Sequence, residues 1–277
     1  MHERRRAAPS SVPSAGATSG MDAEQDMVVM VARVRAVCDQ SAACVDGLLE
    51  AARLGKPLLL ALAHQLVDDT RSELEASDGV FLAVARLKRW HDYAVRHPVA
   101  LCALMQALAR QLVLPQAEVA LAGLAGLLCD IGKALVPADM LQRTERLTAE
   151  EMELLRQHVQ LGQECLYASG VHPEVQQASL LHHERLTGDG YPHRRIDGEI
   201  PLLARMAAIC DVYDANDVRA PQLPALPSRA GVAADGPCRW PVRSAAAQRL
   251  CQRGRRVSRW LPGATGVQAP GRRGRSG

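Results

Sequence analysis

The sequence has 277 residues, of which 48% are hydrophobic and 23% charged, and its formal net charge is +3. These values are ordinary for a soluble globular protein of one or two domains. No stretch reaches the roughly 18 uninterrupted apolar residues that a membrane span needs. Aromatic residues make up only 3% of the chain, so Leu, Ala and Val must form the core, which favours helices.

The cysteines indicate the compartment. The chain has eight of them, scattered along the sequence without any Cys-x-x-Cys pair. This pattern is typical of reduced thiols rather than of a disulfide framework. We therefore expect a cytoplasmic protein.

The first third of the chain divides into a leader and a helical region. Residues 1–21 begin with basic residues and continue with Ser, Pro and Gly, without the apolar segment of a signal peptide. We expect this leader to be disordered, and Met21 is an alternative start. From residue 22 to residue 90 the apolar residues follow a helical pattern, as in MVVMVARVRAVC, which begins at Met27.

A second helical block follows. Val95, Val99, Cys102, Met105 and Leu108 mark one amphipathic helix, and residues 117–132 form a more buried one. Residues 147–166 read as a helix that opens with Thr148 and Glu151 in capping-box spacing. Pro173 and Pro201 each begin a further helix, the first of which runs into two adjacent histidines. Five or six successive helices predict an all-α bundle.

Beyond Arg219 the periodicity stops. Residues 219–277 contain twelve arginines, no lysine and a single acidic residue, Asp235. The tail is also rich in Pro and Gly, so we expect it to be disordered. Without it the chain is acidic overall, so the net charge says little about nucleic-acid binding by the folded part.

Six polar residues fall on apolar helix faces or at helix ends, where desolvation is costly. Taken singly, each is more often a hydrogen-bonded core residue than a ligand. Together they offer four imidazoles and two carboxylates, a donor set that suits Fe, Mn or Zn. An aspartate between histidine ligands can bridge two ions, and the adjacent histidines can serve one site or two neighbouring sites. The six are His97, Asp130, His158, His182, His183 and Asp211.

Three segments carry a resemblance to a known family. They are LLCDIGKALVP from residue 127, RQHVQLGQECL from residue 156 and LLHHERLTGDGYPHRRIDGEIPLLARMAAICDVYDA from residue 180. In order and spacing they resemble the motifs of the HD-GYP family, metal-dependent phosphodiesterases of cyclic di-GMP within the HD phosphohydrolase superfamily. The resemblance covers about residues 91–215 and implies an all-α fold with two, sometimes three, metal ions. It makes residues 91–218 a C-terminally incomplete HD-GYP domain.

The resemblance also implies residue roles. The six residues named above are the metal ligands, and Asp130 bridges two divalent ions. Lys133 contacts a substrate phosphate and acts in catalysis together with Asp130, while Tyr191 approaches the dinucleotide. The implied reaction is hydrolysis in which the ions polarise a phosphoryl oxygen and lower the pKa of the attacking water. Lys133 neutralises the developing charge.

The chain departs from the family pattern at three places. Cys129 stands where the family's HD pair has a histidine ligand, and it reads either as a thiolate ligand or as a small buried residue. Thr187 replaces the aspartate common in the motif HHERxDGxGYP, which puts the pocket geometry more at risk than metal binding. The family's Arg-Pro-Tyr segment is missing, and Arg219 lies near its position without matching it.

The C-terminal departure has two interpretations. We interpret the tail as the product of a changed reading frame near residues 215–220. A genuine basic tail that binds anionic surfaces through its charge is the alternative.

These observations leave several functions open. The first is an HD-GYP phosphodiesterase that hydrolyses cyclic di-GMP to linear pGpG or GMP, with reduced activity. The second is an inactive module that binds cyclic di-GMP or a partner such as a cyclase, and a homodimer is a further expectation. The third is a damaged product of marginal stability. The metal ions, Fe or Mn with Zn as the alternative, can be under-occupied in any of these.

Overall fold

The structure, a computed structural model, describes residues 18–85, 93–142 and 145–217. Within these ranges every regular element is a helix, and the one β-bridge is an isolated pair between Thr187 and Ile196. The predicted all-α fold is therefore confirmed. Residues 1–17, Arg219 and the rest of the tail, on which several predictions fall, lie outside the described residues.

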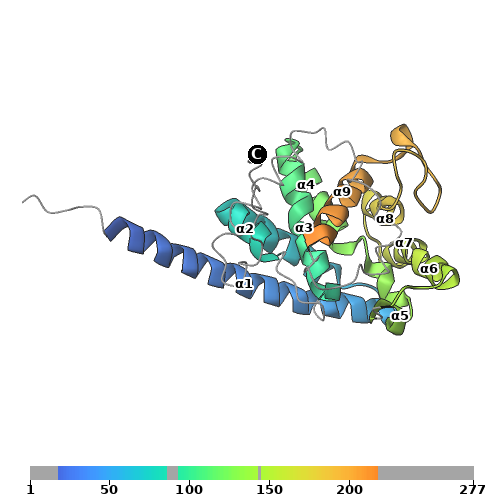
Figure 1. Ribbon diagram of the computed structural model, residues 1–277, viewed down its shortest axis with the longest axis horizontal. Coiled ribbons are helices and arrows are strands. Elements are labelled where there is room, and N and C mark those ends of the chain that lie inside the picture. Colours follow the sequence, from blue (N-terminus) through green and yellow to red (C-terminus); the bar gives the residue numbers. More distant parts are fainter. Residues whose placement is uncertain (1–17, 86–92, 143–144, 218–277) are drawn as a thin grey trace, which may run out of the picture.

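The helices follow one another along the chain, and a longer described connection separates α8 from η3 (Figure 1). In chain order they are α1 (Thr18–Arg53), α2 (Leu60–Ala85), α3 (Tyr93–Gln111), α4 (Gln116–Leu128), the 3₁₀ helix η2 (Ile131–Leu135), α5 (Ala138–Gln142), α6 (Ala149–Arg156), α7 (His158–Ala168), α8 (Pro173–Leu181), the 3₁₀ helix η3 (Asp197–Glu199) and α9 (Leu202–Asp217).

Local signals explain several of these boundaries. The side chain of Thr148 accepts from the amide of Glu151, whose carboxylate in turn accepts from the amide of Thr148, so the predicted capping box is present at α6. Pro173 is the first residue of α8, as predicted, because its fixed φ suits that position.

Several boundaries differ from the prediction. The helix expected over residues 117–132 ends at Leu128, and the 3₁₀ helix η2 follows from Ile131. The single helix expected over residues 147–166 is divided at Gln157 into α6 and α7. The helix expected to run into the histidine pair ends at Leu181, and His182 is its C-cap. Helix α1 already begins at Thr18, inside the expected leader. The apolar periodicity of a sequence can continue past the end of a helix, so it does not predict where the helix ends.

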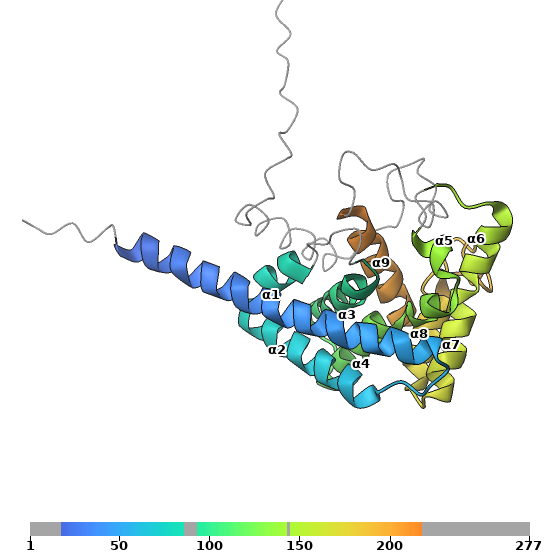
Figure 2. The ribbon, with the colours of Figure 1, turned by 90° about the horizontal axis from the view of Figure 1, so that it is seen from below.

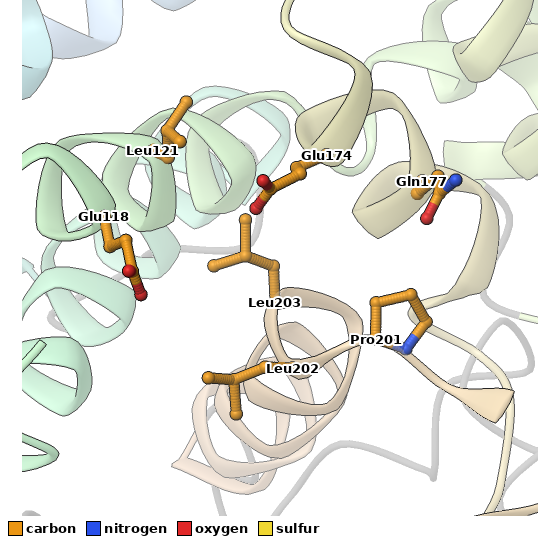
Figure 3. Close-up of a pocket in the computed structure, with 7 residues that line it drawn as sticks. All are labelled: Glu118, Leu121, Glu174, Gln177, Pro201, Leu202 and Leu203. Carbon is orange, nitrogen blue, oxygen red and sulfur yellow. The ribbon is translucent and has the colours of Figure 1, made fainter. Parts of the chain in front are cut away.

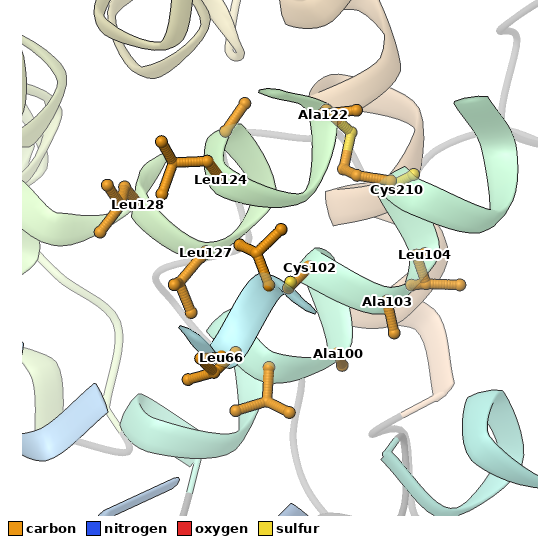
Figure 4. Packing of buried hydrophobic residues seen from close by; sticks show 14 of the residues in the cluster. Leu66, Ala100, Cys102, Ala103, Leu104, Ala122, Leu124, Leu127, Leu128 and Cys210 are labelled. Atoms are coloured by element: carbon orange, nitrogen blue, oxygen red, sulfur yellow. The ribbon is translucent and has the colours of Figure 1, made fainter. Parts of the chain in front are cut away.

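Helix α3 lies at the centre of the bundle and packs against α1, α2, α4 and α9. Small residues allow α4 to approach it closely, since a Cβ atom at Gly126 would lie 2.5 Å from the carbonyl oxygen of Leu101. Figure 4 shows the resulting core, in which Leu66 of α2, Leu104 of α3, Leu127 of α4 and Cys210 of α9 belong to one cluster. The N-terminal helices therefore share one core with the helices that follow.

Helix α1 is longer than the body it packs on. Its N-terminal half extends beyond the other helices in both views (Figures 1 and 2), and Val28 and Val29 are each 64% exposed. Its C-terminal half contributes Val45 and Leu48 to the core. None of the helices in the described ranges is long and apolar enough to cross a membrane.

Candidate metal centre

His97 is buried on α3 and faces carboxylates from two directions. Its Nδ1 lies 2.5 Å from Oδ2 of Asp214, which lies on α9, 117 residues further along the chain. Its Nε2 lies 3.3 Å from Oδ2 of Asp130 and 3.3 Å from Oδ1 of Asp211. The packing of α3 against α9 creates this arrangement, which leaves Nε2 directed at two carboxylates.

Asp130 lies between α4 and η2, and its two carboxylate oxygens face different partners. Oδ1 lies 3.4 Å from Nε2 of His158 and 3.5 Å from Nε2 of His182. Oδ2 lies 3.3 Å from Nε2 of His97 and accepts a hydrogen bond of 2.6 Å from Nζ of Lys133. One side chain thus joins two groups of potential ligands.

His158 and His182 are both oriented by the backbone. Each Nδ1 lies 2.7 Å from a carbonyl oxygen three residues earlier, that of Leu155 or Ser179. A carbonyl can only accept, so in the neutral form of each ring Nδ1 carries the proton and Nε2 keeps its lone pair. Both Nε2 atoms are buried and make no hydrogen bond, and neither does Oδ1 of Asp130. Buried polar atoms of this kind are normally satisfied, so the three atoms fit a cation between them.

His183 stands beside this arrangement and completes it. Its ring centroid lies 3.9 Å from that of His182 and 5.2 Å from that of His158. Its other neighbour is Tyr191, whose ring stacks on it at 4.8 Å with an interplanar angle of 24°. The adjacent histidines therefore belong to one group of potential ligands, which favours one shared site over two neighbouring sites.

The structure brings all six candidate ligands together in two groups that share Asp130. In each group the potential ligand atoms lie within 4.8 Å of one another. The four-donor group consists of Asp130, His158, His182 and His183, and the three-donor group of His97, Asp130 and Asp211. Imidazole and carboxylate donors in this mixture suit Fe, Mn or Zn, so the residues present fit two divalent ions.

The electrostatics of the four-donor group agree with its geometry. Burial would raise the pKa of Asp130, but Lys133 and the surrounding imidazoles hold it well below its ordinary value. Burial lowers the pKa of His158, and it lowers that of His183 further together with the neighbouring imidazoles. These groups are therefore an anion and neutral rings, the forms that bind metal ions.

His97 behaves differently. Burial would lower its pKa, but the nearby carboxylates of Asp130, Asp211 and Asp214 outweigh this effect and raise the pKa to about 9. Without a metal ion the ring is thus protonated at neutral pH, in contact with three carboxylates.

Cys129 belongs to neither group. Its Sγ donates to the carbonyl oxygen of Gly126 at 3.5 Å, and its own carbonyl accepts from Ser179. Burial, together with the nearby Asp130 carboxylate, raises the pKa of the thiol well above its ordinary value. Both observations favour a small buried residue over a thiolate ligand.

Two residues of this region were not singled out from the sequence. Asp214, fully buried, orients His97; it lies one helical turn after Asp211, and this spacing could have indicated it. Glu184, 1% exposed, accepts from the backbone amides of His193 at 2.7 Å and Arg195 at 3.0 Å. It thereby holds the loop that carries Tyr191 beside His183.

The other positions singled out from the sequence are Lys133, Tyr191 and Thr187. Nζ of Lys133 contacts Asp130, as described, and the guanidinium of Arg156 lies 5.4 Å from the centre of the Tyr191 ring. Thr187 is exposed, and its hydroxyl donates to the carboxylate of Asp189 in the same turn. The turn thus has its own polar contact without the expected aspartate.

A hollow elsewhere in the bundle is separate from these residues. It lies between α4, α8 and the start of α9 and is lined by Glu118, Leu121, Glu174, Gln177, Pro201, Leu202 and Leu203 (Figure 3). None of the six candidate ligands lines it, so it has no part in the candidate metal centre.

Comparison with known proteins gives relatives whose names call them phosphodiesterases of cyclic di-GMP or of 3'3'-cGAMP. Cyclic di-GMP phosphodiesterase PA4108 of Pseudomonas aeruginosa is 44% identical over 180 residues, which are 65% of this chain and 44% of that protein. The cyclic di-GMP phosphodiesterase response regulator RpfG of Xanthomonas campestris pv. campestris is 38% identical over 110 residues, 39% of this chain and 29% of that protein. The chain thus spans less than half the length of either relative.

A solved structure and a family model complete the comparison. Bd1817, a HDG"Y"P protein from Bdellovibrio bacteriovorus, shares the fold with a TM-score of 0.60 at 14% identity, over 82% of this chain and 72% of that one. The family model of the HD domain matches residues 66–233 and so begins within α2, before the boundary predicted at residue 91. The chain belongs to the HD domain family, and its motifs assign it to the HD-GYP branch, as the sequence predicted.

Proposed function

We propose that this protein is a metal-dependent phosphodiesterase that hydrolyses cyclic di-GMP to linear pGpG or GMP in the cytoplasm. The observation that carries the proposal is the shared carboxylate of Asp130. One of its oxygens faces the imidazoles of His158 and His182, and the other faces His97. Two relatives with this activity in their names support the substrate.

The proposal assigns the two ligand groups to two divalent ions, Fe or Mn with Zn as the alternative. The bound ions would supply a polarised phosphoryl oxygen and a water of lowered pKa. The chain itself orients the imidazoles through backbone carbonyls and through Asp214, so that Nε2 rather than Nδ1 meets the ions.

Lys133 and Tyr191 are the proposed substrate contacts. Burial alone would lower the pKa of Lys133. The carboxylates of Asp130 and Asp211 outweigh burial and raise this pKa above its ordinary value, so the ammonium stays charged. It is half-buried and available to a phosphate beside the ligands. The Tyr191 ring is held against His183 at the edge of the four-donor group.

A second function is favoured by Cys129, whose thiol lies outside both ligand groups. With one ligand fewer, the chain would be a catalytically inactive module that binds cyclic di-GMP or a partner protein such as a cyclase, alone or as a homodimer. The two functions differ in turnover but not in nucleotide binding.

Turnover distinguishes the two functions. The full chain, loaded with Mn²⁺ or Fe²⁺, is incubated with cyclic di-GMP, and pGpG and GMP are separated by chromatography. We expect hydrolysis that Asp130→Asn and His182→Ala abolish, because both remove a ligand. His64→Ala is the matched control, since His64 is exposed on α2. Binding without product would reject the enzyme in favour of the inactive module.

A further inference from the structure

The two ligand groups differ in their number of donors. The four-donor group offers Asp130 and three imidazoles, whereas the three-donor group offers one imidazole and two carboxylates. Cys129, directly beside Asp130, does not add a donor, because its Sγ is turned to the carbonyl oxygen of Gly126. An ion in the three-donor group would therefore need more of its ligands from water or substrate.

The groups differ again at the carboxylate they share. Oδ1 of Asp130, which faces His158 and His182, makes no hydrogen bond. Oδ2, which faces His97, accepts a short hydrogen bond of 2.6 Å from the ammonium of Lys133. The oxygen that the three-donor group requires is therefore already in contact with a positive charge.

Lys133 acts on the whole three-donor group rather than on one atom. Asp211 also interacts electrostatically with the ammonium, so both carboxylates of that group share its charge. A divalent ion at this place must displace the ammonium from Oδ2 or accept its repulsion at short range. The corresponding oxygen in the four-donor group has no such competitor.

We propose that the two ligand groups fill in a fixed order, the four-donor group first, and that Lys133 competes with the second ion for Oδ2 of Asp130. The proposal rests on the metal centre of the proposed function. It adds that the two ions bind with different affinities and that Lys133 causes the difference. Lys133 thus has a role in setting metal occupancy that is separate from its contact with substrate.

The test is the binding of Mn²⁺ alone to the full chain after removal of metals with a chelator. Calorimetric titration, with metal content measured after dialysis at fixed free Mn²⁺, gives the number of ions and their affinities. We expect one tight ion per chain and a second that binds at least about tenfold more weakly. The electron paramagnetic resonance of Mn²⁺ should be that of an isolated ion at one equivalent, and coupled ions should appear only at higher concentration.

Single substitutions show which ligand group binds the tight ion and which binds the weak one. His183→Ala, at a half-buried position, and His182→Ala should each lose the tight ion, whereas His97→Ala should keep it and lose the weak one. Lys133→Met keeps most of the length of the side chain but removes its charge, and should narrow the gap between the two affinities by about tenfold. His64→Ala should behave as the wild type. Circular dichroism confirms the helical content of each variant.

Three results would overturn the proposal: two ions of equal affinity in the wild type, loss of the tight ion in His97→Ala, or an unchanged gap in Lys133→Met. The first would leave the proposed phosphodiesterase intact, because a filled centre supports it. Absence of any bound Mn²⁺, Fe²⁺ or Zn²⁺ would reject the metal-dependent function itself. The two failures are thus distinguishable.

Discussion

The imidazoles around Asp130 are oriented by acceptors of different strength. Backbone carbonyls hold Nδ1 of His158 and His182, whereas the carboxylate of Asp214 holds Nδ1 of His97. A carboxylate stabilises the imidazolium form more strongly than a carbonyl does, because its hydrogen bond is charge-assisted. His97, which faces Asp130 and Asp211 as well as Asp214, is more basic than His158, whose pKa burial lowers.

We expect this basicity to appear in the stability of the metal-free protein. The pKa of His97 rises from 6.5 to about 9 on folding, so the folded state binds the proton more tightly than the unfolded state. The resulting stabilisation, about 3 kcal/mol, is fully present below pH 6.5 and is lost as the pH rises through 9. Urea unfolding of the metal-free protein, with a chelator present and at several pH values, measures this stabilisation.

Asp214→Asn tests whether Asp214 contributes to the raised pKa of His97. The amide can still accept from Nδ1 but lacks the charge, so the loss of stability with rising pH should become smaller and shift to lower pH. An identical pH dependence in the variant would mean that Asp214 does not control the protonation of His97.

Glu184 is a second residue whose effect can be measured. Its buried carboxylate accepts from the amides of His193 and Arg195, and Glu184→Ala leaves both donors without an acceptor. We expect a loss of about 2–3 kcal/mol in the free energy of unfolding and faster cleavage by trypsin at the arginines of this loop.

Glu199→Ala is the matched control. Glu199 accepts from an amide of the same loop, that of Ile196, but it is exposed, so its loss should cost less than about 1 kcal/mol. Equal effects of the two substitutions would contradict the role given to Glu184.

Between elements, the contact of η2 with α7 brings Asp130 close to His158. A Cβ atom at Gly132 would lie 2.0 Å from the carbonyl oxygen of His158 and 2.5 Å from the amide nitrogen of Gly162. Both atoms belong to the backbone and cannot rotate away, so only glycine allows this approach. The contact links the two helices that carry the shared carboxylate and one of its imidazole partners.

Gly132→Ala should therefore destabilise the protein by about 3 kcal/mol and reduce its metal content, because η2 and α7 must separate. Gly47→Ala is the control, since no atom lies within 4 Å of its Cβ position on α1. There we expect a gain of about 0.5–1 kcal/mol from helix propensity. Thermal unfolding and metal content of both variants measure the difference.

Across the whole molecule, the candidate ligands come from five separate segments of the chain. They come from α3, the α4–η2 junction, the start of α7, the end of α8, and α9. The helices that carry them share one core, and the two ligand groups lie between these helices. Ions bound there would connect helices that are distant in the chain.

We expect metal binding to stabilise the fold measurably. A ligand that binds only the folded state, at a free concentration 100 times its Kd, adds about 2.7 kcal/mol. The midpoint of thermal unfolding should rise with Mn²⁺ and fall on addition of a chelator, and Asp130→Asn should remove most of this response. A wild-type midpoint that does not depend on metal would contradict the proposed centre.

The sequence by itself determined the identity of the candidate ligands and the helices that carry them. Capping signals, proline positions and apolar periodicity are local properties, so they indicated α6, α8 and α3 without tertiary information. The order and spacing of three motifs then indicated the family. The break between α6 and α7 at Gln157 was not predicted, because the apolar periodicity continues across it.

Only the tertiary structure decided how these residues are arranged. Which oxygen of Asp130 faces which imidazole, and that Lys133 contacts the oxygen on the side of His97, depends on the packing of α3, α7, α8 and α9. Asp214 meets His97 across 117 residues, a contact that no local pattern encodes. The physical reason is that residue types and helical faces are short-range properties, whereas the direction of a side chain toward its partners is fixed by contacts between helices.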